Sequence, residues 1–314
     1  MIVSASRRTD IPAFYAEWFM NRIRQGFVHT RNPFRPTQIG RVSLKPATVD
    51  AIVFWTRNAE PLVPHLDELN RMGYRYYFQY TLVHYPKVFE GSSVSLSQKI
   101  DRLRCLSQRV GSERIIWRYD PIILSNLTDQ RYHESLFLEI ARALRGFTHR
   151  CVISFLDIYR KVGKALEKLN REQGVSVIDI HQHENKAREI SRLLSQVGRD
   201  CGLEILSCAE PFNLEEFGIT HGKCIDDELL NRIFGLHLSS PKDKHQRALC
   251  KCVESKDIGA YDTCPHGCIY CYANSCQELA QSNFRRHDRQ SPFLLSSEFE
   301  FPAGMSTAQN HRRT

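Results

Sequence analysis

The chain has 314 residues, of which 42% are hydrophobic and 25% are charged, and its formal net charge at pH 7 is +8. This is an ordinary globular composition, sufficient for one large domain or two smaller ones. The positive charge permits a polyanionic partner without requiring one, because the only basic clusters are the small ones at 284–289 and 311–314, each of which suits either a solvated tail or a nucleic-acid contact.

The N-terminus has only a short apolar start before Arg7 and Arg8, unlike a secretory signal. Nowhere does the chain approach the roughly 18 to 20 consecutive apolar residues of a membrane span. We therefore expect a cytoplasmic protein with no membrane partner. The 11 cysteines are an odd count, and in a compartment that keeps thiols reduced they favour metal ligation over disulfides.

Short β-branched and aromatic runs alternate with amphipathic stretches over the first 210 residues or so. The predicted strands are 2–6, 51–56, 74–82, 114–119, 151–156 and 203–208. Asp10, just before Pro12, predicts the cap of a first helix, and Ser95 with Gln98 has capping-box spacing. The other predicted helices run from Leu62 to Gly73, from Ser95 to Gly111, from Tyr132 to Gly146 and from Ile190 to Val197.

Six β-α repeats fit either a partial barrel of the TIM type or a doubly wound open sheet. We favour an α/β fold with a partial (β/α)6 barrel over residues 1–210, because no Gly-rich dinucleotide turn follows the first strand and polar residues gather at strand ends. Residues 211–278 lose the repeat and gain cysteines, so we expect a cluster-binding segment packed on the barrel rim. Residues 279–314 read as a mostly polar tail, apart from 291–295, which can dock on the surface.

The polar residues at the carboxyl ends of the strands would meet on one rim of a barrel. They are Arg7, Arg8, Asp10, Thr56, Arg57, Asn58, Gln79, Arg118, Asp120, Asp157, Cys208 and Glu210. Any one of them can be a loop residue or a cap, but a rim of convergent charge is costly unless it holds a ligand.

These rim residues suit different tasks. The four arginines can grip phosphate or carboxylate, because a guanidinium binds such anions with two parallel hydrogen bonds. Asp10, Asp120 and Glu210 can pair with the arginines or hold ribose hydroxyls. The nearby aromatic residues Trp55, Tyr80 and Tyr119 either belong to the core or stack on a base.

The stretch TCPHGCIYCYANSC, residues 263–276, carries Cys264, Cys268 and Cys271 at C-x3-C-x2-C spacing. Three thiolates on one short loop match three irons of a [4Fe-4S] cluster and leave the fourth iron without a nearby protein ligand. Zinc is the alternative, although structural zinc sites usually take four ligands in C-x2-C pairs.

The segment CPHGCIYCYA resembles the signature of the radical S-adenosylmethionine superfamily. The resemblance implies that the three cysteines hold a [4Fe-4S] cluster and that Tyr270 lies against the adenine of S-adenosylmethionine. It also implies a partial (β/α)6 barrel and a one-electron donor such as ferredoxin or flavodoxin, whose electron releases a 5′-deoxyadenosyl radical. Thr56, Asn58 and Gln79 are expected to help bind the cofactor.

Longer motifs resemble a bacterial family of domains of unknown function whose hallmark is this C-terminal triad. They are SASRRTDIPAFY, FWTRN, RYDPI, KDKHQR and CVESKDIGAYDTCPHGCIYCYAN, and the likeness spans residues 1–295. In the radical superfamily the triad follows the first strand, whereas here it follows the sixth predicted strand, so the chain must return across the rim to the first one. The chain also lacks a Gly-Gly-Glu segment for the methionine amine, so cofactor binding is implied by the triad alone.

Other cysteines allow further predictions. Cys208, Cys224, Cys250 and Cys252 are either the ligands of a second [4Fe-4S] cluster, with Cys276 as a possible substitute, or small buried residues. Cys105 and Cys151 are expected in the core, and the HQHE stretch at 181–184 is expected to start a helix rather than bind metal.

Three functions remain open from the sequence. The first is a radical enzyme acting on an unknown small molecule or nucleic acid. The second is a nucleic-acid-binding module with a metal-stapled C-terminus, and the third is an iron–sulfur electron carrier.

Overall fold

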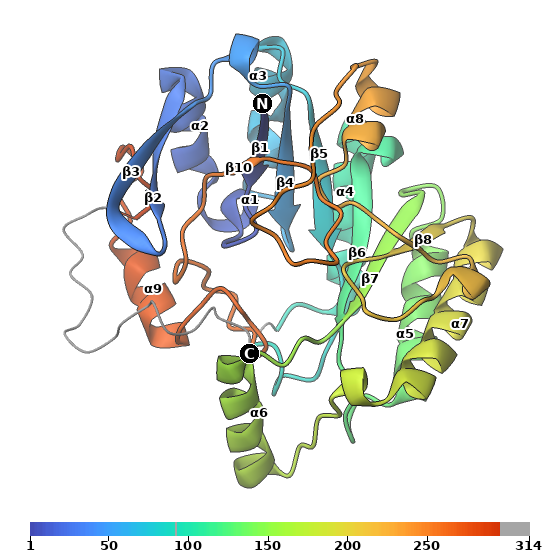
Figure 1. The fold of residues 1–314 in the computed structure, drawn as a ribbon. Coiled ribbons are helices and arrows are strands. Elements are labelled where there is room, and N and C mark those ends of the chain that lie inside the picture. Colours follow the sequence, from blue (N-terminus) through green and yellow to red (C-terminus); the bar gives the residue numbers. More distant parts are fainter. Residues whose placement is uncertain (92, 296–314) are drawn as a thin grey trace.

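The computed structural model describes residues 1–91 and 93–295, which form an eight-stranded parallel sheet and a separate two-stranded hairpin (Figure 1). The sheet order is β10-β1-β4-β5-β6-β7-β8-β9. Its central strands are β1 (Ile2–Ala5), β4 (Ala51–Thr56), β5 (Tyr76–Thr81), β6 (Ile115–Ile122), β7 (Arg150–Phe155) and β8 (Glu204–Ser207). They match the six predicted strands. This parallel sheet with its helices confirms the predicted α/β fold. The edge strands β9 (Thr220–His221) and β10 (Lys256–Asp257) are not paired with each other, so no closed barrel is shown.

Most helices connect successive strands of the sheet and cover one of its faces, but the eighth packs Leu229 and Leu230 on the other face and the ninth follows the last strand. They are α1 (Ile11–Phe14), α2 (Ala16–Gln25), α3 (Leu66–Arg71), α4 (Leu96–Val110), α5 (Gln130–Ala143), α6 (Arg160–Gln173), α7 (Glu184–Cys201), α8 (Asp227–Phe234) and α9 (Gln277–Arg285). Single 3-10 turns lie at Pro46–Thr48, Val63–His65, Ser112–Arg114, Ile180–Gln182 and Glu215–Phe217. None of the helices in the described residues is both long and apolar enough to cross a lipid bilayer.

Local signals in the sequence place several helix starts correctly. The Asp10 carboxylate accepts a hydrogen bond from Ala13 N at 3.0 Å and so caps α1. Ser95 and Gln98 form the predicted capping box of α4. The HQHE stretch leads into α7, whose first residue is Glu184.

The two predicted core cysteines have different surroundings. Cys151 is fully buried in β7, as expected. Cys105 is exposed, so its predicted core position is wrong. The buried stripe of α4 is formed by Ile100, Leu103 and Leu106, and residue 105 projects from the other side of that helix.

The two faces of the sheet bury different residues because successive side chains of a strand alternate. Val3, Ile52 and Phe54 belong to the large core under the helices. The opposite face has an apolar layer that includes Ile2, Ala51, Val53, Tyr77, Ile116, Val152 and Leu206. The segment from Cys224 to Val253, which contains α8, packs against this layer and covers the face that the other helices leave open.

After α8 the chain returns across the sheet to the opposite edge, where β10 pairs in parallel with β1 (Figure 1). The Asp257 carboxylate accepts hydrogen bonds from Ser4 Oγ at 2.8 Å, Ser6 Oγ at 2.6 Å and Arg7 N at 2.9 Å. Ile258 N donates to Ser4 O at 3.0 Å. These bonds fix the start of the triad loop to the carboxyl end of the first strand.

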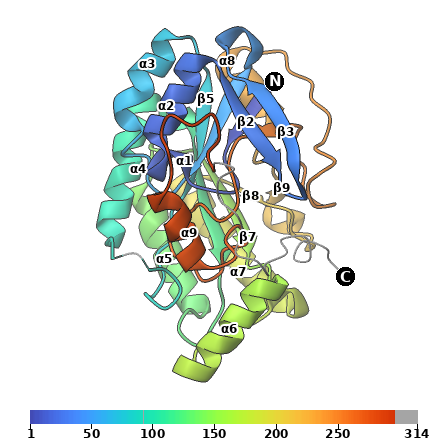
Figure 2. The same cartoon turned by 90° about the vertical axis from the view of Figure 1, so that its left-hand side faces the viewer.

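A hairpin that the sequence analysis did not predict joins α2 to β4. Its strands are β2 (Phe27–Asn32) and β3 (Arg35–Ser43). The end of the described chain lies on the same side of the molecule as this hairpin (Figure 2). His29 N donates to Pro292 O at 2.9 Å, Trp18 Nε1 donates to Ser291 O at 2.9 Å, and Leu294 is buried. The predicted tail at 279–314 therefore differs from expectation at its start, where α9 (Gln277–Arg285) is a helix that buries Ala280 and Asn283. Residues 296–314 lie outside the described residues.

Candidate functional site

A cavity of about 890 Å³ opens at the carboxyl ends of the strands. Most of the predicted rim residues line it, namely Arg7, Arg8, Asp10, Thr56, Arg57, Arg118, Asp120, Asp157 and Cys208. The triad cysteines line it too, as do Cys224, Cys250 and Cys252. Its volume lies within the range of roughly 300–1,000 Å³ that is usual for ligand sites.

Three predicted site residues are not among those that line the cavity, and their side chains bond elsewhere. The Asn58 carboxamide oxygen accepts from Glu60 N at 3.2 Å. Gln79 is buried and donates through Nε2 to Cys224 O at 2.7 Å. Glu210 accepts from Phe155 N at 2.9 Å, and burial raises the pKa of its carboxyl to about 8.

The triad loop is held by hydrogen bonds to its backbone. Gly267 has φ +79°, a left-handed conformation that suits glycine and turns the chain between the first two cysteines. Cys271 N donates to Cys268 O at 3.1 Å, and Asn274 Nδ2 donates to Cys264 O at 2.6 Å. The buried Tyr15 hydroxyl donates to Thr263 O at 2.5 Å. Backbone contacts therefore fix the loop and leave the three sulfurs at the cavity wall.

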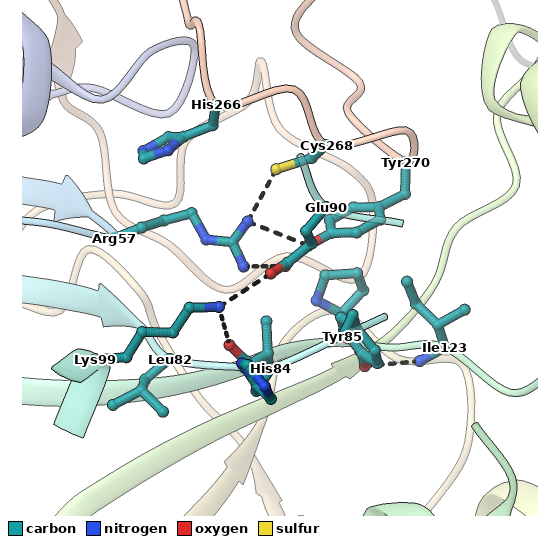
Figure 3. A network of polar contacts seen from close by, with 12 residues as sticks. Arg57, Leu82, His84, Tyr85, Glu90, Lys99, Ile123, His266, Cys268 and Tyr270 are labelled. Atoms are coloured by element: carbon teal, nitrogen blue, oxygen red, sulfur yellow. Dashed lines mark hydrogen bonds and ion pairs between the residues drawn. The ribbon is translucent and has the colours of Figure 1, made fainter. Parts of the chain in front are cut away.

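Figure 3 shows a charged network beneath Cys268. Arg57 Nη1 donates to Cys268 Sγ at 2.9 Å and lies 3.2 Å from the Tyr270 hydroxyl. The Glu90 carboxylate is buried, pairs with Arg57 Nη2 and accepts from the Tyr270 hydroxyl. Lys99 Nζ lies 3.2 Å from the same carboxylate. Arg57 is therefore fixed in a position that offers a hydrogen bond to a triad sulfur.

Asp10 joins three parts of the site. Besides capping α1, its carboxylate accepts from Arg57 N at 2.7 Å at the end of β4. It also lies 2.8 Å from His266 Nε2 in the triad loop. A residue predicted to contact the ligand is thus already bonded to the elements that shape the cavity.

Burial raises the pKa of two of the triad thiols. Burial raises the pKa of Cys268 to about 11 although Arg57 opposes the shift. Burial likewise raises the pKa of Cys264 well above its ordinary value. Metal ligation requires thiolates and releases their protons, so an occupied site would differ in charge from the free thiols described here.

A second group of cysteines, Cys208, Cys224, Cys250 and Cys252, lies on another wall of the same cavity. Cys224 Sγ is 3.4 Å from Cys208 Sγ. Cys252 Sγ accepts from Cys224 N at 3.3 Å and from Ile225 N at 3.4 Å. The hydrogen bond with Cys224 lowers the pKa of Cys208 to about 7, and the pKa of Cys252 is also lowered by hydrogen bonds from Cys224 and Cys250.

Two arginines lie next to this second group, on Trp55. The Arg7 and Arg118 guanidinium carbons are 5.3 Å and 5.1 Å from the Trp55 ring centre, within cation–π range. Arg118 Nη1 donates to Cys224 Sγ at 2.8 Å. Arg7 Nη2 and Trp55 Nε1 are buried and have no hydrogen-bond partner in the described part of the chain. Unpartnered buried donors at a cavity are a place where an anionic or polar ligand gains binding energy.

Within residues 1–91 and 93–295, no three cysteine, histidine, aspartate or glutamate side chains converge as the ligands of a single metal ion would. The donor chemistry of the two thiol groups still suits an iron–sulfur cluster, whose ligands are cysteine sulfurs spread around several irons. Cys276 is the residue before α9 and is not among the residues that line the cavity.

Several residues of the site were missed by the sequence analysis. Glu90 lies in the loop between β5 and α4, away from any strand end, and its only signal is an acid after the apolar residues 88–89. Lys99 lies on α4 and His266 lies inside the triad motif, where a histidine has no pattern of its own. Tyr80 and Tyr119 are core residues, whereas Trp55 lines the cavity.

A search of curated proteins finds no match to this chain. A family model described as "Domain of unknown function (DUF1848)" matches residues 2–273, which include the whole sheet and the complete triad. The match covers most of the chain, and the protein therefore belongs to the DUF1848 family.

Proposed function

We propose that this protein is an iron–sulfur enzyme of the radical S-adenosylmethionine type, with Cys264, Cys268 and Cys271 as ligands of a [4Fe-4S] cluster. The observation that supports this most is the position of the triad. Its three sulfurs line the same cavity as the charged residues at the strand ends. Three cysteines leave one iron open for a cofactor, and the cavity provides room for it.

The strand order supports the same proposal. In the superfamily that the triad resembles, the cysteine loop follows the first strand of a partial barrel. Here the loop follows β10, and the strands beyond it are β1, β4, β5, β6, β7 and β8, in that order and all parallel. We propose that this order corresponds to a partial barrel whose first strand has moved to the C-terminal part of the chain, with β8 and β9 as additional strands.

The cluster with S-adenosylmethionine would supply a 5′-deoxyadenosyl radical that abstracts a hydrogen atom from the substrate. The residues of this chain would orient and shield the reactants. Arg57 would donate to the Cys268 sulfur, and hydrogen bonds to cluster sulfurs are one of the levers that set reduction potential. Arg7, with its unpartnered nitrogen, and Arg118 would bind an anionic group of the cofactor or substrate.

The second thiol group is proposed to hold another [4Fe-4S] cluster. Four cysteines would ligate all of its irons, which suits electron transfer or structural support. Arg7 and Arg118 would offset its negative charge. Ferredoxin or flavodoxin is the proposed class of electron donor.

Anaerobic reconstitution with iron and sulfide tests the proposal. The reduced protein should show the electron paramagnetic resonance signal of a [4Fe-4S] cluster and should convert S-adenosylmethionine to 5′-deoxyadenosine. Cys268→Ala should lose the signal of the open-iron cluster and the product while the protein stays folded. Cys276→Ala is the matched control because Cys276 does not line the cavity, and it should retain both.

Two results would count against the enzyme. A reduced, iron-loaded protein that never consumes S-adenosylmethionine, with or without candidate substrates, would contradict it. Reversible redox chemistry without 5′-deoxyadenosine would favour the electron carrier, the alternative that the second thiol group supports. Zinc binding that depends on Cys268 would replace the iron assignment altogether.

A further inference from the structure

The hairpin beside the cavity is a basic surface. We call residues 27–43 the basic arm; they contain Arg31, Arg35 and Arg41 and no acidic residue. Residues 30–34 and 38–40 of the arm line the cavity. The arm is therefore part of the cavity mouth as well as of the outer surface.

The arm exposes large apolar side chains next to its arginines. Phe34 is 59% exposed and Ile39 is 51% exposed, and both line the cavity. Tyr272, in the triad loop, lines the same cavity and is 44% exposed. Apolar groups gathered at a cavity mouth mark a binding surface more often than scattered ones do.

Packing in the core does not explain why the hairpin is present, because a two-stranded sheet has little core of its own. All residues from Phe34 to Arg41 are exposed, and only Val28 and Val42 are buried within the two strands. A long arm that contributes so little to the core is better explained by what it contacts outside the molecule.

A second basic segment lies against the arm. Residues 284–295 contain Arg285, Arg286 and Arg289 with one acid, Asp288. The Arg31 guanidinium lies 4.5 Å from the Phe293 ring centre, and His29 N donates to Pro292 O at 2.9 Å. Two basic stretches that are far apart in the sequence therefore touch each other, and together they contain six arginines and a single acid.

We propose that the basic arm and residues 284–295 bind single-stranded nucleic acid. Arginines along a surface attract the phosphate backbone, and exposed aromatic rings stack on unpaired bases. The cavity has the size of a small-molecule site, so one nucleotide can enter it whereas a duplex cannot. Binding on the arm is independent of the iron chemistry; only the presentation of a nucleotide to the cavity rests on the proposed function.

Fluorescence anisotropy with labelled oligonucleotides of about 15 nucleotides tests the proposal, since such binding sites span roughly 4–16 nucleotides. The full chain is used without added iron. Poly-U and poly-dT probes separate RNA from DNA, and a blunt duplex of the same length is the third probe. Single strands should bind more tightly than the duplex, and their affinity should fall steeply between about 0.05 and 0.2 M salt.

Arg35→Ala combined with Arg41→Ala removes two charges from the arm. It should weaken single-strand binding at least about tenfold. It should also reduce the salt slope, the slope of log affinity against log salt concentration, by about 1.4, since each of the two lost phosphate contacts contributes about 0.7. The matched control is Arg131→Ala with Arg192→Ala, two exposed arginines on α5 and α7 that do not line the cavity. The control should stay within about twofold of the parent, because it removes the same charge from another part of the surface.

Phe34→Ala separates stacking from charge. It should weaken single-strand binding about tenfold while leaving the salt slope unchanged. Circular dichroism should show that every variant melts as the parent does. Duplex binding as tight as single-strand binding would overturn the proposal, and so would an equal loss in the control pair. No iron is added in this assay. A negative binding result would therefore not contradict the proposed cluster, and a negative result in the iron reconstitution would not contradict nucleic-acid binding.

Discussion

Glu90 provides the sharpest test of how the site is held together. Its carboxylate is 2% exposed, pairs with Arg57 Nη2 and lies 3.2 Å from Lys99 Nζ. Glu90→Gln keeps the shape of the side chain but leaves two partly buried cations without their shared anion. Removing one partner of a buried ion pair costs about 3–5 kcal/mol, so we expect the free energy of unfolding to fall by that amount at pH 7.

The sign of the pH dependence follows from the pKa of Glu90. Burial pushes this pKa up, but Arg57 and Lys99 outweigh burial, and the net shift is downward from 4.5. A carboxyl whose pKa is lowered by folding stabilises the protein above its unfolded pKa and loses that effect as pH falls through the folded value. The cost of Glu90→Gln should therefore be complete at neutral pH and should shrink in acid.

Urea unfolding followed by circular dichroism measures this cost. Glu60→Gln is the matched control: Glu60 lies 2.9 Å from Arg102 Nε, but its side chain is 55% exposed. An exposed pair of this kind contributes about 1 kcal/mol or less. If the two variants cost the same, the Glu90 network does not stabilise the site and the reasoning fails. In the Glu90→Gln background, Lys99→Met should recover part of the loss, because it removes one uncompensated charge.

Two further predictions concern other parts of the fold. Burial lowers the pKa of His133 from 6.5 to about 4. As pH falls, the histidine is therefore protonated in the unfolded chain before it is protonated in the folded protein, and the folded state loses stability between pH 6.5 and about pH 4. His133→Gln should reduce the loss between pH 7 and pH 5 by about 2 kcal/mol, measured by urea unfolding at both pH values, and an unchanged loss would contradict the assignment. Gly259 has no room for a side chain because a Cβ there would lie 2.6 Å from Ser6 Cβ; Gly259→Ala should therefore cost about 1–3 kcal/mol and lower the iron content after reconstitution. Gly91→Ala, whose nearest atom would be His266 O at 3.8 Å, should be near neutral in both measurements, and equal effects of the two changes would show that the close approach to Ser6 is unimportant.

The strands of the sheet could be predicted because buried parallel strands read as continuous apolar runs. The Asp10 cap and the Ser95 capping box were also readable, since both depend on residues only three positions apart. The hairpin could not be found this way. Its exposed residues have no apolar alternation. Strand β10 could not be predicted either, because it has only two residues and its pairing with β1 depends on contacts across the whole chain.

The prediction placed most rim residues at the cavity correctly, but it did not give the partner toward which each side chain points. Strand ends do meet at one edge, which is why Arg57, Arg118 and Asp120 line the cavity. Gln79 was placed by the same rule, yet its amide binds the backbone of Cys224, 145 residues later. A partner so far along the chain leaves no local trace in the sequence, and the same is true of the pairing between Glu90 and Arg57.

The pairing of β10 with β1 also fixes the order in which the protein can be completed on the ribosome. Val3 is among the first residues to be synthesised, but its outer neighbour Lys256 is made only after every other strand of the sheet. Until then the outer edge of β1 has no partner, and the Arg57 guanidinium has no sulfur to contact. The triad cysteines thus arrive at a cavity whose other walls are already built, so the proposed cluster would be inserted into a finished sheet and not into a growing one.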